Sequence, residues 1–219
     1  MRQIYKAVVF DLDGTLINTI YDLADSGNEL LASFGKAAHT VDEYRYFVGN
    51  GSRKLVERIL PEFTPAEVDA ALEKYKGIYA RRLFNKTKVY DGILALLDAL
   101  TEMHIMKAVC TNKHMSAAES IIDHFFKEGT FNAYVGDRAG YPRKPDPANV
   151  FYVLDKLGVK PEETVYLGDS SVDMKTAVRA GVLPVGVLWG FRERDELVES
   201  GAKILIEKPM DLLEKVDFR

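Results

Sequence analysis

The sequence lacks the features of secreted and membrane proteins. Only one of its 219 residues is a cysteine, Cys110, so no disulfide can form within the chain, as is typical of a reducing compartment. Cys110 lies in an apolar run, and we interpret it as a small core residue. No apolar stretch approaches the roughly 18 residues of a membrane span, and the N-terminal segment has no signal-peptide core. We therefore expect a cytoplasmic protein that binds no membrane.

An excess of positive charge is also missing. The formal net charge is −4 and the isoelectric point is near 5.7, with the basic residues dispersed along the chain, which argues against nucleic-acid binding. The four histidines show no metal-ligand spacing, and only His114 is expected near a functional site. What the chain does have is 47% hydrophobic residues, enough for one large domain or for a domain with an insertion.

The most informative stretch lies near the N-terminus. An apolar, β-branched segment over residues 4–10 predicts a strand buried on both faces. Asp11 and Asp13 follow where this strand should end, and Gly14 comes next. Two carboxylates held close together repel each other, so this arrangement predicts a compensating hard cation such as Mg²⁺. An ordinary Asp-Gly turn is the alternative, and the residues do not fit an EF-hand calcium loop.

Residues 18–85 are predicted to form four helices without a convincing strand. Apolar residues recur at helical spacing up to Phe34, and Gly35 supplies a stop. Ser52 can cap a further helix. At Thr64, the sequence Thr-Pro-Ala-Glu is typical of a helix start, with a cap, a proline at the first position and a glutamate three residues after the cap.

From residue 90 onwards, predicted helices alternate with strands. The strands are expected at residues 105–110, 133–135, 164–167, 184–188 and 202–206. Such alternation predicts an α/β fold with a doubly wound, mostly parallel sheet covered by helices on both faces. We expect residues 1–17 and 86–219 to form this core domain. Residues 18–85 would then be an α-helical cap inserted above the carboxyl ends of the strands, where ligands of such sheets bind.

Four polar motifs occur at predicted strand ends or in loops. In chain order they are Asp11-Leu12-Asp13-Gly14-Thr15, Thr111-Asn112, Lys144 before Pro145, and Gly168-Asp169-Ser170-Ser171-Val172-Asp173. Together and in this order they resemble the haloacid dehalogenase (HAD) superfamily of phosphatases, which have a Rossmann-like core. The resemblance implies a Mg²⁺-dependent phosphatase that acts on a small phosphorylated metabolite.

The acidic residues have the chemistry that such a reaction requires. A carboxylate can attack a phosphate monoester and form an aspartyl-phosphate, and the resemblance assigns this role to Asp11. It implies that Mg²⁺ is bound by the side chains of Asp11 and Asp169 and by the backbone carbonyl of Asp13. The Asp13 side chain is then free to protonate the leaving oxygen and later to activate water.

The remaining motif residues are expected around the phosphate. Lys144 offers a second positive charge, Thr111 a hydroxyl and Asn112 an amide donor. The resemblance makes Asp173 a partner of the metal either behind its direct ligands or through water. Each also has a plain structural interpretation: a solvated lysine, a Thr-Asn turn, and a carboxylate at the start of a helix.

A segment of the helical block bears on the substrate. Its residues Gly49, Asn50, Gly51 and Arg53 resemble the cap segment of phosphoglycolate phosphatases. The glycines permit close backbone approach, and amides at the start of the following helix favour an anion such as a carboxylate. Arg53 would add a charged contact, whereas the alternative is a helix–helix turn with a surface arginine. Phosphoglycolate is therefore the first candidate substrate.

Other functions stay open at this point. A sugar or nucleotide phosphatase or a phosphomutase of the same superfamily would use the same core. A dehalogenase is less compatible, because its chemistry needs neither Asp13 nor a metal. A non-enzymatic binding protein on this fold would be expected to have lost some of the motif carboxylates, all of which are present. A monomer and a homodimer are both compatible with the sequence.

Overall fold

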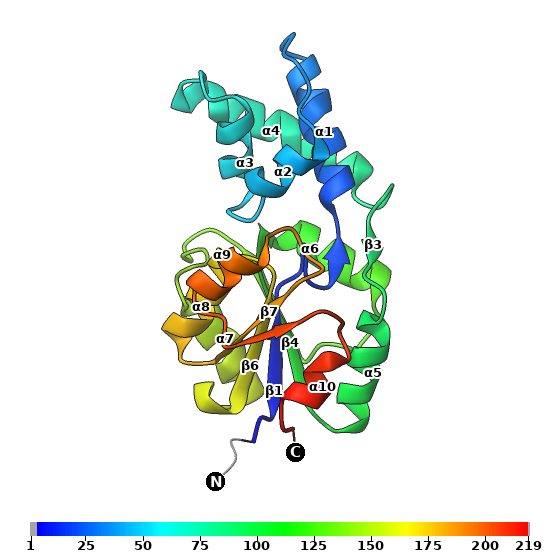
Figure 1. The fold of residues 1–219 in the computed structure, drawn as a ribbon. Helices are drawn as coiled ribbons and strands as arrows, with labels where there is room; N and C mark the ends of the chain where they lie inside the picture. The colour runs from blue at the N-terminus through cyan, green and yellow to red at the C-terminus, as the bar shows by residue number, and fades with distance from the viewer. Residues whose placement is uncertain (1–3, 219) are drawn as a thin grey trace.

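The computed structural model describes residues 4–218, which form a layered α/β unit with four helices above it (Figure 1). The strands are β1 (Ala7–Phe10), β2 (Ile17–Asn18), β3 (Lys88–Val89), β4 (Met106–His114), β5 (Ala133–Asp137), β6 (Thr164–Gly168), β7 (Leu183–Val187) and β8 (Ile204–Ile206). The helices are α1 (Ile20–Ala32), α2 (Val41–Phe47), α3 (Ser52–Ile59), α4 (Pro65–Arg82), α5 (Ile93–Glu102), α6 (Met115–Phe125), α7 (Ala148–Leu157), α8 (Ser171–Ala180), α9 (Arg194–Glu199) and α10 (Asp211–Lys215), with one 3₁₀ turn, η1 (Pro161–Glu163).

Six of these strands form one sheet in the order β5-β4-β1-β6-β7-β8, and every neighbouring pair is parallel. The central strand β1 is hydrogen-bonded on both sides, with Ala7 opposite Met106 of β4 and Thr164 of β6. The predicted fold class, a doubly wound parallel sheet with helices on both faces, is confirmed. None of the helices within residues 4–218 is long and apolar enough to cross a bilayer.

The continuous apolar run of β1 is explained by burial on both faces of the sheet. Ala7 and Val9 pack into a cluster with side chains of α7 and α8, whereas Val8 and Phe10 pack with α5, α6 and α10. All four of these side chains are fully buried. Because successive strand residues point to opposite faces, both sides of β1 must be apolar.

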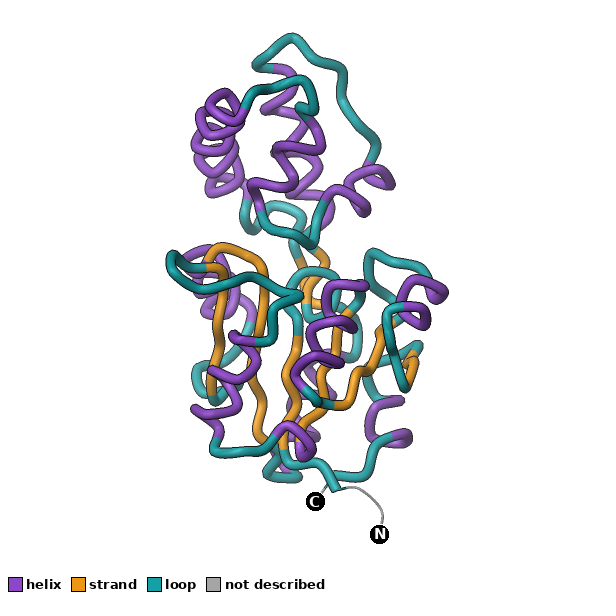
Figure 2. Tube along the Cα trace, turned by 90° about the vertical axis from the view of Figure 1, so that its left-hand side faces the viewer, coloured by secondary structure: helices purple, strands orange, loops and turns teal. Residues whose placement is uncertain are grey.

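Helices α1 to α4, which we call the cap helices, lie beyond the carboxyl ends of the parallel strands (Figures 1 and 2). The predicted start of α4 is confirmed: the Thr64 hydroxyl accepts the N–H of Glu67, and the Glu67 carboxylate accepts the N–H of Thr64. Ser52 differs from the prediction. It is the first residue of α3 and not its cap, because Gly51 takes the cap position with φ of +85°.

Two short strands were not predicted. Where the chain leaves the core and where it returns, β2 and β3 form an antiparallel pair with Ile17 opposite Val89. Asp22 of α1 holds the same region together, since its carboxylate accepts the backbone N–H groups of Lys86 and Thr87 and the Thr87 hydroxyl at 2.8–3.1 Å. Asp22 is completely buried. The two chain segments that connect the cap helices to the core are therefore linked to each other by hydrogen bonds.

The second strand of the core is longer than expected. It was predicted to end at residue 110, but β4 continues to His114, and its pairing with β5 shifts register between Cys110 and His114. Thr111 and Asn112 therefore lie within the last part of the strand. Both are buried, so the strand carries these polar groups to the edge of the sheet beneath the cap helices.

Replacing Asp22 by alanine is expected to lower the free energy of unfolding by about 2–4 kcal/mol, because buried donors lose a charged acceptor. Urea unfolding followed by circular dichroism measures the change. Asp25→Ala is the matched control, since Asp25 lies on the same helix in a partly exposed ion pair with Lys86 and should cost less than about 1 kcal/mol. Equal losses in the two variants would contradict this account of the crossing.

Candidate active site

Three buried carboxylates meet at the carboxyl end of the sheet. Asp11 follows β1, Asp169 follows β6, and Asp173 lies in the first turn of α8; one oxygen of each can be chosen so that all three lie within 4.8 Å of one another. The N–H of Asp11 donates to the carbonyl of Leu167 at 2.9 Å, which locks the ends of β1 and β6 side by side. The structure thus brings together acidic residues that are far apart in the sequence.

Lys144 lies between two of these carboxylates. Its Nζ is 2.8 Å from Oδ1 of Asp11 and 2.7 Å from Oδ1 of Asp173, and it also donates to the hydroxyl of Tyr166 at 3.1 Å. The side chain is 2% exposed. Lys144 is not among the described residues that line the pocket above, so its positive charge acts on the site through Asp11.

Asp173 is held by the start of its own helix. Its Oδ2 accepts the N–H and the hydroxyl of Ser170 at 3.1 and 2.6 Å, which forms a capping box, while its Oδ1 accepts Lys144. Both oxygens therefore already have donors. This arrangement suits a residue that holds Lys144 and the start of α8 in place better than one that binds a cation directly.

Asp169 is enclosed by backbone. Its Oδ2 accepts the N–H of Phe191 at 2.8 Å, and its Oδ1 lies 3.4 Å from the hydroxyl of Thr15. Gly14, with φ of +89°, packs directly on the carboxylate, and a Cβ at this position would overlap it. The glycine of the first motif is thus required both by its backbone conformation and by the space that Asp169 occupies.

Burial sets the electrostatics of this cluster. Loss of solvation, with repulsion from Asp173, raises the pKa of Asp11 to about 7, although Lys144 opposes the shift. Loss of solvation, together with repulsion from Asp173 and Asp11, raises the pKa of Asp169 well above its usual range. Two buried carboxylates with raised pKa values are a site at which an added positive charge would be favourable.

The donor set fits a divalent cation. Among residues 4–218, Lys144 is the one charged partner of Oδ1 of Asp11, so a single ammonium group offsets the charges of both Asp11 and Asp173. Asp169 offers a second carboxylate at the same place. Hard, anionic oxygen ligands are what Mg²⁺ and similar ions bind.

The side chain of Asp13 is directed to a different set of partners. Its Oδ1 accepts the Thr19 hydroxyl at 2.7 Å, and Lys113 Nζ lies 2.9 and 3.1 Å from its two oxygens. Lys113 also donates to the hydroxyl of Tyr79 on α4 at 2.7 Å. Asp13 is therefore separated from the acidic cluster in its contacts and joined to a cap helix.

Thr111 and Asn112 both line the pocket but differ in their hydrogen bonds. The Thr111 hydroxyl accepts the N–H of Lys113 at 3.2 Å and keeps its own hydrogen for another acceptor. The Asn112 amide donates to the carbonyls of Gly49 and Lys144 at 3.1 Å each, and its oxygen accepts the N–H of Lys144. In this arrangement Asn112 connects the Lys144 loop to a cap loop and has no amide hydrogen left for phosphate.

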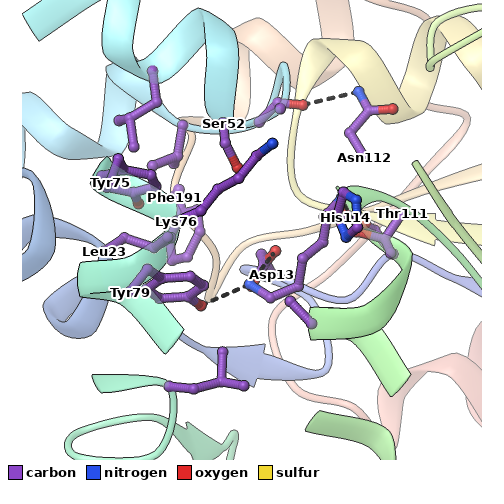
Figure 3. Close-up of a pocket in the computed structure, with 18 of the residues that line it drawn as sticks. Asp13, Leu23, Ser52, Tyr75, Lys76, Tyr79, Thr111, Asn112, His114 and Phe191 are labelled. Atoms are coloured by element: carbon purple, nitrogen blue, oxygen red, sulfur yellow. Dashed lines mark hydrogen bonds and ion pairs between the residues drawn. The ribbon is translucent and has the colours of Figure 1, made fainter. Parts of the chain in front are cut away.

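A pocket of about 480 Å³ lies between the sheet end and the cap helices (Figure 3). Asp11, Asp13 and Asp169 lie among its lining residues on the core side. The cap helices and the residues next to the ends of α2 and α4 contribute a mostly apolar wall. This wall includes Leu23, Val48, Leu55, Tyr75, Leu83 and Phe84.

The predicted cap residues do not all reach this pocket. Gly49 and Gly51 line it, and so does His114. Asn50 and Arg53 are not among the described residues that line it. The Asn50 side chain accepts a hydrogen bond from Arg58 at 2.7 Å. The Arg53 guanidinium lies between the carboxylates of Glu57 on α3 and Asp69 on α4. The structure differs here from the expected substrate contact of Arg53.

Sequence reasoning missed Lys113 and Tyr79. Lys113 directly follows Thr111-Asn112, so its place in the chain was a usable signal for a charge at the strand end. Tyr79 carried no such signal, because one tyrosine on an amphipathic helix is typical of a core position. Only the packing of α4 over the end of β4 brings it to the site.

A parallel sheet with carboxylates at its strand ends, beneath a helical cap, is the arrangement of an α/β enzyme whose site lies at the carboxyl edge of the sheet. The chain belongs to the haloacid dehalogenase-like hydrolases, since the model of that family matches residues 8–187. The membership suggested by the four motifs is confirmed.

Relatives over nearly the whole chain are phosphatases. Phosphoglycolate phosphatase 1 of Pseudomonas aeruginosa is 31% identical over 97% of this chain and 80% of its own length. Phosphoglycolate phosphatase of Mannheimia succiniciproducens is 30% identical over 99% of this chain and 100% of its own. The structure is similar, with a TM-score of 0.90 and 27% identity over 98% of both chains, to a predicted phosphoglycolate phosphatase from Haemophilus somnus. These comparisons support the expected enzyme class, a phosphatase.

The raised pKa of Asp11 makes stability depend on pH in a defined direction. The folded protein keeps a proton on Asp11 up to about pH 7, whereas the unfolded chain releases it near pH 4. In EDTA, the free energy of unfolding should therefore fall as pH rises between these values, by up to about 1.4 kcal/mol per pH unit for one proton.

Urea unfolding of the wild type and Asp11→Asn at pH 5, 6 and 7 in EDTA measures the titration of Asp11 together with its coupling to Asp169, because groups away from the cluster largely cancel in the difference. We expect the wild type to lose stability relative to the variant as pH rises, and Mg²⁺ to reduce that loss. Parallel curves for the two proteins would contradict the assigned environment of Asp11.

Proposed function

We propose that this chain is a Mg²⁺-dependent phosphatase that hydrolyses a small phosphorylated metabolite through an aspartyl-phosphate on Asp11. The observation that carries the proposal is the buried pair of Asp11 and Asp169 at adjacent strand ends, together with Asp173, whose oxygens lie close enough to share one cation. The side chains of Asp11 and Asp169 and the backbone carbonyl of Asp13 would hold the ion. When bound, it would offset the negative charges of the nucleophile and the phosphoryl group.

The chain's own residues supply the remaining chemistry. The Asp11 carboxylate attacks phosphorus, the phosphorus–oxygen bond to the alcohol breaks, and Asp13 gives a proton to the leaving oxygen. Asp13 then takes a proton from the water that cleaves the aspartyl-phosphate, which returns both carboxyl groups to their starting forms. Lys144 keeps the attacking carboxylate in place, and Thr111 can donate its hydroxyl to the phosphoryl group.

We propose residues 18–85 as the substrate-selecting cap and residues 1–17 and 86–219 as the catalytic core. Phosphoglycolate is the first candidate substrate, because relatives at about 30% identity are phosphoglycolate phosphatases. The start of α3 supports it: Gly51 and Ser52 border the pocket, and amides of a first helical turn bind carboxylates well.

A second candidate is a phosphatase for larger esters, such as sugar phosphates or nucleotides. The mostly apolar wall and the volume of about 480 Å³ favour it, since pockets of this size enclose ligands much larger than a two-carbon acid. Phosphomutase activity would use the same core residues, but no observation favours it over hydrolysis.

Asp11→Asn is expected to lower phosphatase turnover by roughly 10³-fold or more, because the neutral amide is a poor nucleophile. Phosphate release from p-nitrophenyl phosphate in Mg²⁺ measures it, and EDTA should abolish activity in the wild type. Asp25→Asn, on the surface of α1, is the control and should keep full activity. Turnover by Asp11→Asn close to that of the wild type would rule out this nucleophile.

Arg53→Ala should change kcat/KM for phosphoglycolate by less than about threefold, because its guanidinium is already paired outside the pocket. Gly51→Ala is the matched variant on the same loop. It should raise KM clearly, since alanine disfavours the φ of +85° that α3 needs at its start.

A panel of phosphoglycolate, sugar phosphates, nucleotides and pyrophosphate with both variants decides between the two candidates. If neither variant affects phosphoglycolate while a larger ester is hydrolysed much faster, the larger ester is the substrate class.

A further inference from the structure

Lys113 is a buried cation at the site for which the proposed reaction has no role. It lies near the end of β4, and its side chain is 5% exposed. Three oxygens surround its ammonium group: the two carboxylate oxygens of Asp13 at 2.9 and 3.1 Å and the hydroxyl of Tyr79 at 2.7 Å. The Tyr79 ring also lies against it, with the ammonium 4.8 Å from the ring centre.

These contacts join three separate parts of the chain. Asp13 follows β1, Lys113 is on β4, and Tyr79 is on cap helix α4. Figure 3 shows the Tyr79 ring next to Asp13 in the wall of the pocket. The ring is held in turn by stacking on Tyr75, with the ring centres 6.0 Å apart and the planes 8° from parallel. The position of the Asp13 carboxylate is thus coupled to a cap helix.

The ammonium has no hydrogen left for a substrate. A lysine donates three hydrogen bonds, and those of Lys113 match the two Asp13 oxygens and the Tyr79 oxygen. A lysine that bound the phosphate would have to leave at least one of these partners. Its contacts are those of a group that holds Asp13 in place.

We propose that Lys113, with Tyr79, is a positioning residue that fixes the Asp13 carboxyl group for proton exchange with the leaving oxygen. The inference rests on the proposed function, in which Asp13 is the acid and base. Proton transfer needs the two heavy atoms about 2.6–3.2 Å apart, and a displacement of about 1 Å can cost roughly 10² in rate. Without Lys113, the Oδ2 atom of Asp13 loses its hydrogen-bond donor and the carboxyl group can rotate.

The leaving group distinguishes this role from a general structural one. An alkoxide leaves poorly unless it is protonated, so hydrolysis of an alkyl ester depends on a well-placed Asp13. p-Nitrophenolate is a stabilised anion that departs without a proton. Loss of Lys113 should therefore slow formation of the aspartyl-phosphate from an alkyl ester and hardly affect its formation from p-nitrophenyl phosphate.

The experiment compares the first turnover of wild type and Lys113→Met, in Mg²⁺, on p-nitrophenyl phosphate and on the fastest alkyl ester of the substrate panel. We expect alcohol release from the alkyl ester to fall about 10–100-fold. Release of the first p-nitrophenolate should stay within about threefold and be followed by slower turnover, because Asp13 must also activate water. Equal slowing of both first turnovers, or a higher KM with unchanged kcat on both esters, would overturn the proposal.

Lys107→Met is the matched control, since Lys107 is equally buried on the same strand but donates to Thr101 away from the pocket. It should show no difference between the two esters. Tyr79→Phe keeps the ring and removes the hydroxyl, and it should show the Lys113→Met pattern more weakly. If Lys113→Met does not fold, Tyr79→Phe and Lys113→Arg decide the question by the same comparison. Inactivity of the wild type on every ester would refute the proposed function, whereas an active wild type with uniformly slowed variants refutes only the role of Lys113.

Discussion

The site depends above all on one buried lysine placed between two buried carboxylates. A carboxylate without a partner in the protein interior costs several kcal/mol, so neither Asp11 nor Asp173 would be tolerated there alone. Lys144 pairs with both, and the hydroxyl of Tyr166 completes its shell. Since Asp173 also caps α8, the same contact fixes this helix relative to the end of β1. The contacts of Lys144 therefore compensate the buried charges and also fix the geometry of the strand ends.

A few hydrogen bonds above the Lys144 contacts join the cap helices to the core. Arg192 donates to the carbonyl of Val48 at 3.0 Å, Arg45 donates to the carbonyl of Gly190 at 3.2 Å, and Asn112 donates to Gly49. All three acceptors are backbone carbonyls, so these contacts depend on the backbone positions of residues 48, 49 and 190. A change in the position of the cap would therefore act directly on Asn112, which is next to Thr111 in the chain.

Much of the core could be predicted because β1 and β6 are buried on both faces and therefore read as apolar runs, and because helices such as α4 and α7 have clear end signals. The short helices α9 and α10 were not predicted. Residues after strands were correctly expected at one edge of the sheet, since parallel strands place their carboxyl ends together. The pair β2–β3 could not be found, because two-residue strands have no periodicity. Arg53 was expected at the substrate from its place after two glycines, but the pairing with Glu57 and Asp69 depends on how α3 packs against α4. The environment of Lys113 also depends on a tertiary contact, with Tyr79.

The double crossing between cap and core has a mechanical consequence. In an antiparallel pair the hydrogen bonds run between the two strands, so sliding one strand past the other would break them. Here Asp22 of α1 accepts the N–H groups of Lys86 and Thr87, just before β3, so the outgoing and returning segments are held to each other as well as to the core. The four cap helices are thus attached through one paired connection, and a change at either segment is transmitted to the other.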